Sequence, residues 1–294
     1  MDELRRFARE MLEKQEVAAV IGYEQVGKTR TRPVIITDPA GCGRLVLNEY
    51  CLNNLVVYLN RARIKALARS KEGIKKLAIV AKPCDIRSIV ALIQENQIRK
   101  ENLVIIGMNC HGVVRDFGSD FNGDNLAAKC ISCIARSSSY ADKSFGEVQE
   151  IPKFTGKLTY DLSEIEQLPP GKRLEFFREQ FDKCIKCYAC RAVCPLCYCQ
   201  RCITDKTIPR WIESSSHSRG NFAWNIVRAF HLSGRCTGCG ECERACPMDI
   251  PLSLLNRKMA MASKELFGYE SGISIDNPTL VGSYDQKDSD KLFM

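Results

Sequence analysis

The chain has 294 residues, which allows two domains at roughly 100–200 residues each, and its 45% apolar and 27% charged residues are typical of globular proteins. This composition excludes wholesale disorder, a collagen-like chain and a coiled-coil rod. The formal net charge of +8 comes without a basic stripe interleaved with aromatic residues, so we expect no nucleic-acid partner. No apolar run reaches about 18 residues and no secretory signal begins the chain, so we expect no membrane span and a cytoplasmic location.

Hydrophobic spacing predicts the elements of the first half. In chain order, we expect a helix over 2–16, strands over 17–24 and 34–37, a helix over 48–69, a strand over 77–81, a helix over 85–96 and a strand over 103–108. The last three form a βαβ unit, which implies neighbouring parallel strands that are buried on both faces.

The second half follows a stretch without regular spacing. Residues 137–170 show no periodicity and end in Pro169-Pro170-Gly171, where we place the domain boundary. Amphipathic spacing then predicts helices around 174–181, over 221–233 and over 252–267. From about residue 268 the chain is polar and rich in Asp, which indicates a docking tail or a frayed end.

Seventeen cysteines, an odd number, are the unusual feature of the composition. Disulfides do not explain them, because cytosolic thiols stay reduced and the chain is too long to need covalent staples. Metal binding does explain them. Part of the excess of Lys and Arg then offsets the negative charge of the clusters. Three 4Fe–4S clusters with about two negative charges each would lower the net charge to about +2.

Two copies of the pattern C-x2-C-x2-C-x3-C-P dominate the second half. In this pattern the three closely spaced cysteines supply three thiolates to one cubane, and the fourth ligates the cluster of the other copy. The sequence therefore predicts two 4Fe–4S clusters that lie close enough for electron transfer. The first has the ligands Cys184, Cys187, Cys190 and Cys246, and the second has the ligands Cys194, Cys236, Cys239 and Cys242.

A pair of zinc sites is the alternative for these motifs. Zinc sites usually consist of two separated C-x2-C knuckles, which three evenly spaced cysteines followed by Cys-Pro fit poorly. A long insertion between the two copies adds Cys197, Cys199 and Cys202. These three are either packing residues or ligands of a further site that includes Cys42 or Cys51, and we favour packing because free Cys is among the most buried residue types.

A third group of cysteines lies in the first half. Cys84 follows the first strand of the βαβ unit, Cys110 follows the second, and Cys130 and Cys133 form a C-x2-C pair in the next loop. Residues just beyond the carboxyl ends of neighbouring parallel strands share one edge of a sheet. The four thiols therefore either converge on a third cluster or are two buried cysteines and an incidental pair. His111 fits a hydrogen-bonded neighbour of this group better than a ligand.

Several segments resemble known redox subunits. KPCDI at 82–86, IIGMNCHG at 105–112 and CISC at 130–133 resemble the beta subunits of deazaflavin-reducing hydrogenases and related formate dehydrogenases. This resemblance implies a third 4Fe–4S cluster, and an FAD beside it, with the cluster ligands Cys84, Cys110, Cys130 and Cys133. The cysteine-rich segment 184–252 resembles the iron–sulfur beta subunit of cytoplasmic sulfhydrogenases and the A subunit of anaerobic sulfite reductase. The spacing assigns no residue to the flavin.

Residues 22–29, GYEQVGKT, match the P-loop expression G-x4-G-K-T. A functional P-loop opens a helix whose N-terminus binds phosphate. Here Pro33 and β-branched residues follow, so the segment predicts a strand, a loop and a strand, and we expect no nucleotide hydrolysis.

These observations predict three parts of the chain: an α/β domain with a partly parallel sheet over 1–165, a mainly helical, ferredoxin-like domain with two 4Fe–4S clusters over 172–267, and a tail over 268–294. We expect an iron–sulfur subunit that carries single electrons between partner subunits of a cytoplasmic anaerobic oxidoreductase complex. By resemblance, the host is a hydrogenase, a formate dehydrogenase or a heterodisulfide-reductase type of complex.

Two other functions remain open at this point. The chain is alternatively an FAD-bearing dehydrogenase subunit that oxidises NAD(P)H or a deazaflavin and passes the electrons to its own clusters. The second alternative is a zinc-stabilised scaffold subunit. With three histidines and no paired-carboxylate site, the sequence singles out no catalytic side chain.

Overall fold

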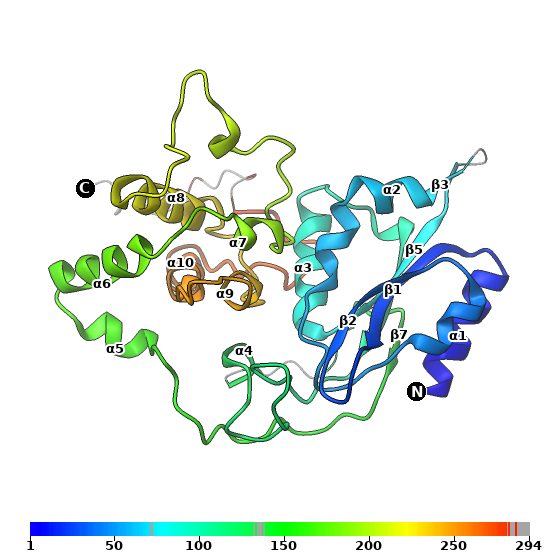
Figure 1. The fold of residues 1–294 in the computed structure, drawn as a ribbon. Coiled ribbons are helices and arrows are strands. Elements are labelled where there is room, and N and C mark those ends of the chain that lie inside the picture. The colour runs from blue at the N-terminus through cyan, green and yellow to red at the C-terminus, as the bar shows by residue number, and fades with distance from the viewer. Residues whose placement is uncertain are drawn as a thin grey trace. The chain divides into compact units, whose positions relative to one another are not determined.

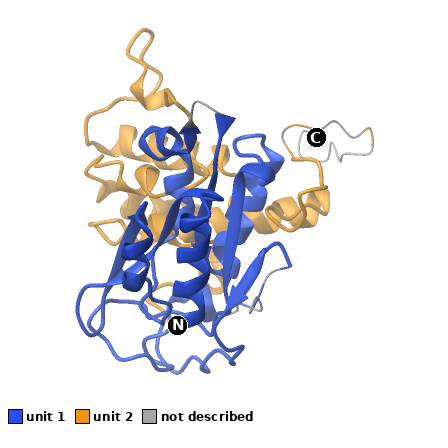
Figure 2. Cartoon of the chain, turned by 90° about the vertical axis from the view of Figure 1, so that its right-hand side faces the viewer, with its two compact units in different colours: residues 1–157 blue, residues 158–294 orange. Residues whose placement is uncertain are grey.

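The computed structural model describes residues 1–70, 73–131, 133, 137, 139–280, 282 and 286 of the chain. The chain divides into two compact units, unit 1 (Met1–Lys157) and unit 2 (Leu158–Met294), which Figure 2 shows in blue and orange. Positions 281, 283–285 and 287–294 of the predicted tail lie outside the described residues.

Unit 1 is built around a five-stranded sheet with the strand order β2-β1-β5-β6-β7 (Figure 1). The strands are β1 (Val17–Gln25), β2 (Thr31–Ile36), β5 (Lys76–Ala81), β6 (Leu103–Met108) and β7 (Lys143–Phe145). β1 and β2 are antiparallel, whereas the pairs β1–β5, β5–β6 and β6–β7 are parallel. The predicted partly parallel sheet is confirmed. The edge strand β7 was not predicted, because three residues are too few to show a period of two.

The parallel part of the sheet contains the predicted βαβ unit. Helix α3 (Pro83–Gln94) connects β5 to β6 and packs against both strands. Pro83 suits the first helical turn, where a backbone N–H would have no partner within the helix. Helix α1 (Asp2–Glu13) packs against β1. Burial of β1 and β5 on both faces explains their nearly continuous apolar sequences.

The single helix predicted over 48–69 is wrong. The segment contains a 3-10 helix, η2 (Leu55–Asn60), and a short helix, α2 (Ala62–Ala68). The Asn54 side chain accepts a hydrogen bond from the N–H of Val56 at 3.0 Å, and this cap starts a new turn inside the predicted helix. The apolar residues Leu52, Leu55, Val56 and Leu59, which suggested the helix, are nevertheless buried, so their spacing indicated burial and not helical structure.

The segment 22–29 with the P-loop pattern lies in the hairpin between β1 and β2, so the predicted strand, loop and strand are confirmed. The hairpin opens no helix there. The remaining elements of unit 1 are η1 (Pro39–Arg44), β3 (Arg69–Ser70), β4 (Gly73–Ile74), η3 (Lys100–Asn102) and α4 (Ala128–Ile131).

Unit 2 is helical, as predicted, and its long helices coincide with the three amphipathic segments of the sequence. Its elements are α5 (Leu162–Gln167), α6 (Pro170–Asp182), α7 (Ala189–Ala192), η4 (Ile203–Asp205), α8 (Ser218–His231), α9 (Glu241–Arg244) and α10 (Leu252–Phe267). Helix α8 packs against both α6 and α10. None of the helices in the described part of the chain combines the length and the apolar character that crossing a membrane requires.

Candidate metal centres

Two cavities in unit 2 are each lined by four cysteines, three from one motif and one from the other. Cavity 1 is lined by Cys184, Cys187, Cys190 and Cys246. Cavity 2 is lined by Cys194, Cys236, Cys239 and Cys242. The folded chain thus groups the thiols in the two crossed sets that the motif spacing predicts.

The loops around the middle cysteine of each motif share one backbone shape. Lys186 and Tyr188 in the first motif have φ angles of 56° and 57°, and Gly238 and Gly240 in the second have φ angles of 70° and 71°. Alternation of right-handed and left-handed residues turns successive N–H groups to one side, and this concavity binds anions. The N–H of Lys186 donates a hydrogen bond to Sγ of Cys184 at 3.4 Å. Both loops therefore suit a negatively charged group.

Helix α8 (labelled in Figure 1) comes from the insertion between the motifs and contributes to the lining of both cavities. Trp224 and Asn225 line cavity 1, whereas Arg228 and Leu232 line cavity 2. Trp224 and Arg228 are four residues apart, which is a rise of about 6 Å along the helix. The two cavities are therefore neighbours along one rigid element, which suits the exchange of electrons between two bound groups.

Arg228 is a residue of the site that the sequence analysis missed. Its side chain is buried, at 4% exposure, and Nη2 donates to the carbonyl oxygen of Cys190 at 3.1 Å. Its Nε has no hydrogen-bond partner among the described residues. A signal was present, because Trp224, Arg228 and Leu232 share one face of the predicted helix and place a charge on an otherwise apolar stripe.

Two of the cavity thiols lie in the hydrophobic core of unit 2. Cys190 and Cys242 pack with Trp224 and Ile250 in one buried cluster. Burial raises the pKa of the Cys190 thiol and raises the pKa of Cys242 to about 12. Ionised thiolates in such surroundings need a cation that offsets their desolvation, and iron would supply it. The amide of Asn256 donates to Sγ of Cys242 at 3.7 Å, which is a contact that also favours the thiolate.

Two of the arginines that border the motifs are paired with carboxylates. Arg191 lies 2.9 Å from Asp205, and Arg244 lies 2.8 Å from Glu241. Arg191 lowers the pKa of Asp205, so this pair is charged at neutral pH. The carboxylates offset much of the positive charge that these arginines bring to the motifs. Arg228 differs, since no carboxylate of the described residues forms an ion pair with it.

Unit 1 places two of the other predicted cysteines, Cys84 and Cys110, just after the carboxyl ends of parallel strands. Cys84 lies in the first turn of α3, directly after β5, and Cys110 follows β6. Cys130 lies in α4, and its carbonyl oxygen accepts a hydrogen bond from the N–H of Cys133 at 3.3 Å. Cys110 lies within electrostatic range of both Cys84 and Cys130. His111 stacks edge-on against Phe121, with ring centroids 5.2 Å apart.

A fifth thiol, Cys51, lies beside this group and was not among the predicted ligands. It is fully buried and interacts electrostatically with Cys110 and Lys82. Its Sγ donates to Oδ1 of Asn48 at 3.6 Å, and burial raises the pKa of the thiol to about 11. Cys51 is therefore a neutral thiol at physiological pH. It precedes η2 in an irregular segment, where spacing carries no information about position.

A buried ion pair adjoins Cys84. Nζ of Lys82 lies 2.6 Å from Oδ2 of Asp85, and the two side chains are 1% and 0% exposed. Lys82 also donates to the hydroxyl of Tyr23 at 2.6 Å and to the carbonyl oxygen of Asn53 at 2.8 Å. Burial alone would lower the pKa of Lys82, but the Asp85 carboxylate outweighs it and holds that pKa above its usual value. The positive charge of Lys82 therefore lies close to the Cys84 thiol.

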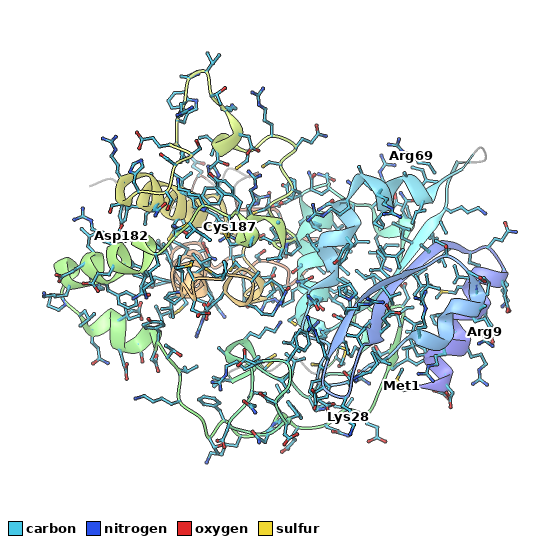
Figure 3. The ribbon with its side chains drawn as sticks, viewed as in Figure 1. Met1, Arg9, Lys28, Arg69, Asp182 and Cys187 are labelled. Carbon is cyan, nitrogen blue, oxygen red and sulfur yellow. The ribbon has the colours of Figure 1, made fainter. Side chains whose placement is uncertain are left out.

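The cysteines outside these three groups have different surroundings. Cys197 hydrogen-bonds with Cys194 of cavity 2, and Cys42 is buried in η1 of unit 1. Cys199 is exposed, which the packing interpretation does not explain. Cys187, labelled in Figure 3, is also exposed, but it belongs to the first motif and lines cavity 1. Within the described ranges, no three His, Cys, Asp or Glu side chains are grouped closely enough to hold a single metal ion.

Two segments of the chain match known families. Residues 180–250, which contain both motifs, match the family "4Fe-4S dicluster domain". Residues 74–120, which contain β5, α3 and β6, match the family formed by the C-terminal part of the beta subunit of coenzyme F420 hydrogenase/dehydrogenase. The predicted resemblance of the first half to such beta subunits and the presence of a 4Fe–4S dicluster domain are therefore confirmed.

Whole-chain comparison finds relatives of the same kind. The F420-dependent formate dehydrogenase subunit beta of Methanocaldococcus jannaschii is 26% identical, over 70% of this chain and 76% of the relative. The F420-dependent formate dehydrogenase 1 subunit beta of Methanococcus maripaludis is 25% identical over the same shares. A chain of the F420-reducing NiFe hydrogenase complex from Methanosarcina barkeri has a TM-score of 0.27 and 17% identity, over 36% of this chain and 37% of that chain. The chain is thus similar in sequence to beta subunits of F420-dependent formate dehydrogenases.

Proposed function

We propose that this chain is the iron–sulfur electron-transfer subunit of an oxidoreductase complex and carries single electrons between partner subunits. The observation that carries the proposal is the exchange of one cysteine between the two motifs, which surrounds each cavity with four thiols. We assign one 4Fe–4S cluster to cavity 1 and one to cavity 2, with the lining cysteines as ligands. Such clusters accept and release single electrons when bound.

We assign a third 4Fe–4S cluster to unit 1, with the ligands Cys84, Cys110, Cys130 and Cys133. The position of Cys84 and Cys110 at the carboxyl ends of parallel strands supports this assignment, as does the family match over 74–120. Lys82 and Lys129 supply positive charge beside Cys84. The anionic cluster would thus be held by thiolates and balanced by buried and partly buried ammonium groups.

In electron transfer, the role of the protein's own residues is to hold, bury and orient the two clusters. The loops with left-handed residues border the cysteines, α8 lines both cavities, and the apolar core packs around Cys190 and Cys242. Cavity 1 approaches the surface at Cys187 and Ile185, both of which are exposed. We therefore assign cavity 1 to electron exchange with a partner subunit.

The host complex follows from the relatives. The relatives named above are beta subunits of F420-dependent formate dehydrogenases, so we propose a formate dehydrogenase or a hydrogenase as the host. We place the complex in the cytoplasm, where thiols stay reduced and available for cluster assembly.

A second candidate function has its own support. The relatives are named F420-dependent, and residues 74–120 match the beta-subunit family, so unit 1 is a candidate to hold an FAD that exchanges a hydride with the deazaflavin F420 or with NAD(P)H. A flavin is the cofactor that converts a hydride into single electrons. Under this function the same clusters receive their electrons within one chain.

Anaerobic purification of the full chain, followed by iron, acid-labile sulfide, flavin and zinc quantification, separates these functions. Electron transfer alone predicts about twelve iron atoms per chain and no flavin, at four iron atoms per cluster. About eight iron atoms would remove the third cluster. One flavin per chain, released on denaturation, would favour the second candidate. Zinc without iron would contradict both and support a scaffold.

Cys239→Ala is expected to remove the cavity 2 cluster, because the cubane loses one of its four ligands. Iron should fall from about twelve to about eight atoms per chain, and electron throughput should fall more than about 100-fold, beyond the loss typical of an outer-shell partner. EPR of the dithionite-reduced protein and acceptor reduction measure both effects. The control is Cys199→Ala, at an exposed cysteine outside both cavities. An unchanged EPR spectrum in Cys239→Ala would contradict the ligand assignment.

Cys110→Ala tests the third cluster separately. If the thiol is a ligand, iron should again fall by about four atoms per chain while the two signals assigned to unit 2 persist. Cys42→Ala is the matched control, because Cys42 is also a buried thiol of unit 1 but lies outside the group. Equal iron contents in the two variants would show that Cys110 is a packing residue.

A further inference from the structure

The strongest feature that the proposed function leaves unused is the buried charge of Arg228. A guanidinium keeps its charge at every physiological pH, so burial cannot be relieved by loss of a proton. Its described protein contacts are to neutral groups or thiols, with the carbonyl oxygen of Cys190 at 3.1 Å as the measured hydrogen bond. A buried cation without a carboxylate is costly, so the site must supply another anion.

The anion that fits is a cluster in cavity 2. Arg228 lines that cavity, and Nε remains without a hydrogen-bond partner among the described residues. The thiols that interact with it most strongly are Cys242 and Cys194, both of cavity 2, followed by Cys197 and then Cys190 of cavity 1. Arg228 is part of the lining of cavity 2 and not of cavity 1, so its charge adjoins the second cluster.

We propose that Arg228 is the built-in counter-ion of the cavity 2 cluster and raises its reduction potential above the value that the same cysteine cage would give without it. This inference rests on the proposed function, since it presupposes a cluster in cavity 2. One electron enters from the donor subunit, no bond forms or breaks, and no proton moves. The charge of the cluster with its thiolates changes from about −2 to about −3, and a fixed cation favours the more negative state.

The charge of Arg228 therefore affects the direction in which an electron moves between the two clusters. The fixed charge acts more strongly on the cavity 2 cluster, so that cluster becomes the better acceptor of the pair and holds the electron longer. Arg228 acts on the cluster through its charge and does not ligate the iron. The other arginine that lines cavity 2, Arg257, is exposed, so water and salt screen its charge.

Arg228→Gln and Arg257→Gln form a matched pair, because each removes one positive charge from the lining of the same cavity. Glutamine keeps a polar but uncharged side chain, which is shorter than that of arginine. Both variants of the full chain are purified anaerobically, their iron is counted, and each cluster is titrated with dithionite and followed by EPR. The cavity 2 signal is identified as the one that Cys239→Ala removes.

We expect Arg228→Gln to keep its iron and to shift the midpoint potential of the cavity 2 signal to a more negative value. The shift of the cavity 1 signal should be smaller, and Arg257→Gln should shift neither signal as far. Unshifted potentials in Arg228→Gln, or equal shifts in the two variants, would overturn the inference. An iron-free wild-type chain would instead refute the proposed function, so the two failures are distinguishable.

Arg228→Lys decides the case in which Arg228→Gln loses its iron. Lysine keeps the charge while changing the shape, so restored iron and a potential near that of the wild type would support the counter-ion role. Iron loss in Arg228→Lys as well would show that the shape of the arginine matters and its charge does not, which would overturn the inference. A shift in Arg228→Lys as large as that in Arg228→Gln would have the same meaning.

Discussion

Lys82→Met is expected to lower the free energy of unfolding of unit 1 by about 3–5 kcal/mol, because it leaves the Asp85 carboxylate buried without its cation. The hydroxyl of Tyr23 and the carbonyl oxygen of Asn53 lose a donor at the same time. For a unit of this length, the loss corresponds to a fall in Tm of roughly 6–20 °C. Thermal denaturation and amide hydrogen exchange in β5 and β6 measure it.

Two further variants show whether the lost stability comes from the buried pair. Lys100→Met removes a lysine whose carboxylate partner, Asp142, is 42% exposed, and an exposed pair of this kind contributes at most about 1 kcal/mol. The double variant Lys82→Met with Asp85→Leu removes both charges and should recover part of the loss, because two apolar groups need no partner. Equal stability of Lys82→Met and Lys100→Met would contradict the importance of the buried pair.

Removal of the iron is expected to unfold most of unit 2. Its buried core includes the cavity thiols Cys190 and Cys242, and the helices that carry them, α7 and α9, have four residues each. Helices this short are not stable without tertiary contacts. Metal–thiolate bonds at structural zinc sites contribute about 10–16 kcal/mol to folding, and bonds to a cluster act in the same way.

Hydrogen exchange before and after anaerobic chelation measures this coupling. We expect amide protection in α8 to fall at least about 1,000-fold, which corresponds to about 4 kcal/mol. The hairpin of strands β1 and β2 in unit 1 is the internal control, since none of the assigned cluster ligands lies in or directly after these strands. Unchanged protection in α8 after complete loss of iron would show that unit 2 folds without its clusters.

The regular elements could be predicted wherever a long period was present in the sequence. The βαβ unit at 77–108 and the long helices of unit 2 follow from apolar spacing alone. The helix over 48–69 failed because a local side-chain cap at Asn54 competes with helical spacing, and a single period cannot reveal such competition. The strand β7 is stabilised by its parallel partner β6 and has too few residues for a pattern of its own.

The candidate site shows the same division between local and long-range information. The cysteine motifs encode the crossed sets of thiols, because their spacing is itself the geometry of the loops. The positions of Arg228 and Cys51 depend on which elements pack together, and neither residue belongs to a motif. For Arg228 a charge on the apolar face of a helix was the available signal, whereas Cys51 offered none.

Helix α8 contributes to both cavities at once, with Trp224 on one and Arg228 on the other. A helix turns by about 100° per residue, so an insertion or deletion between these two positions would swing one of them away from its cavity. Point substitutions on the outward side of α8 leave this arrangement intact. The two cavities therefore depend more on the number of residues between Trp224 and Arg228 than on the identity of the outward side chains, and a change in that number would disturb both cavities together.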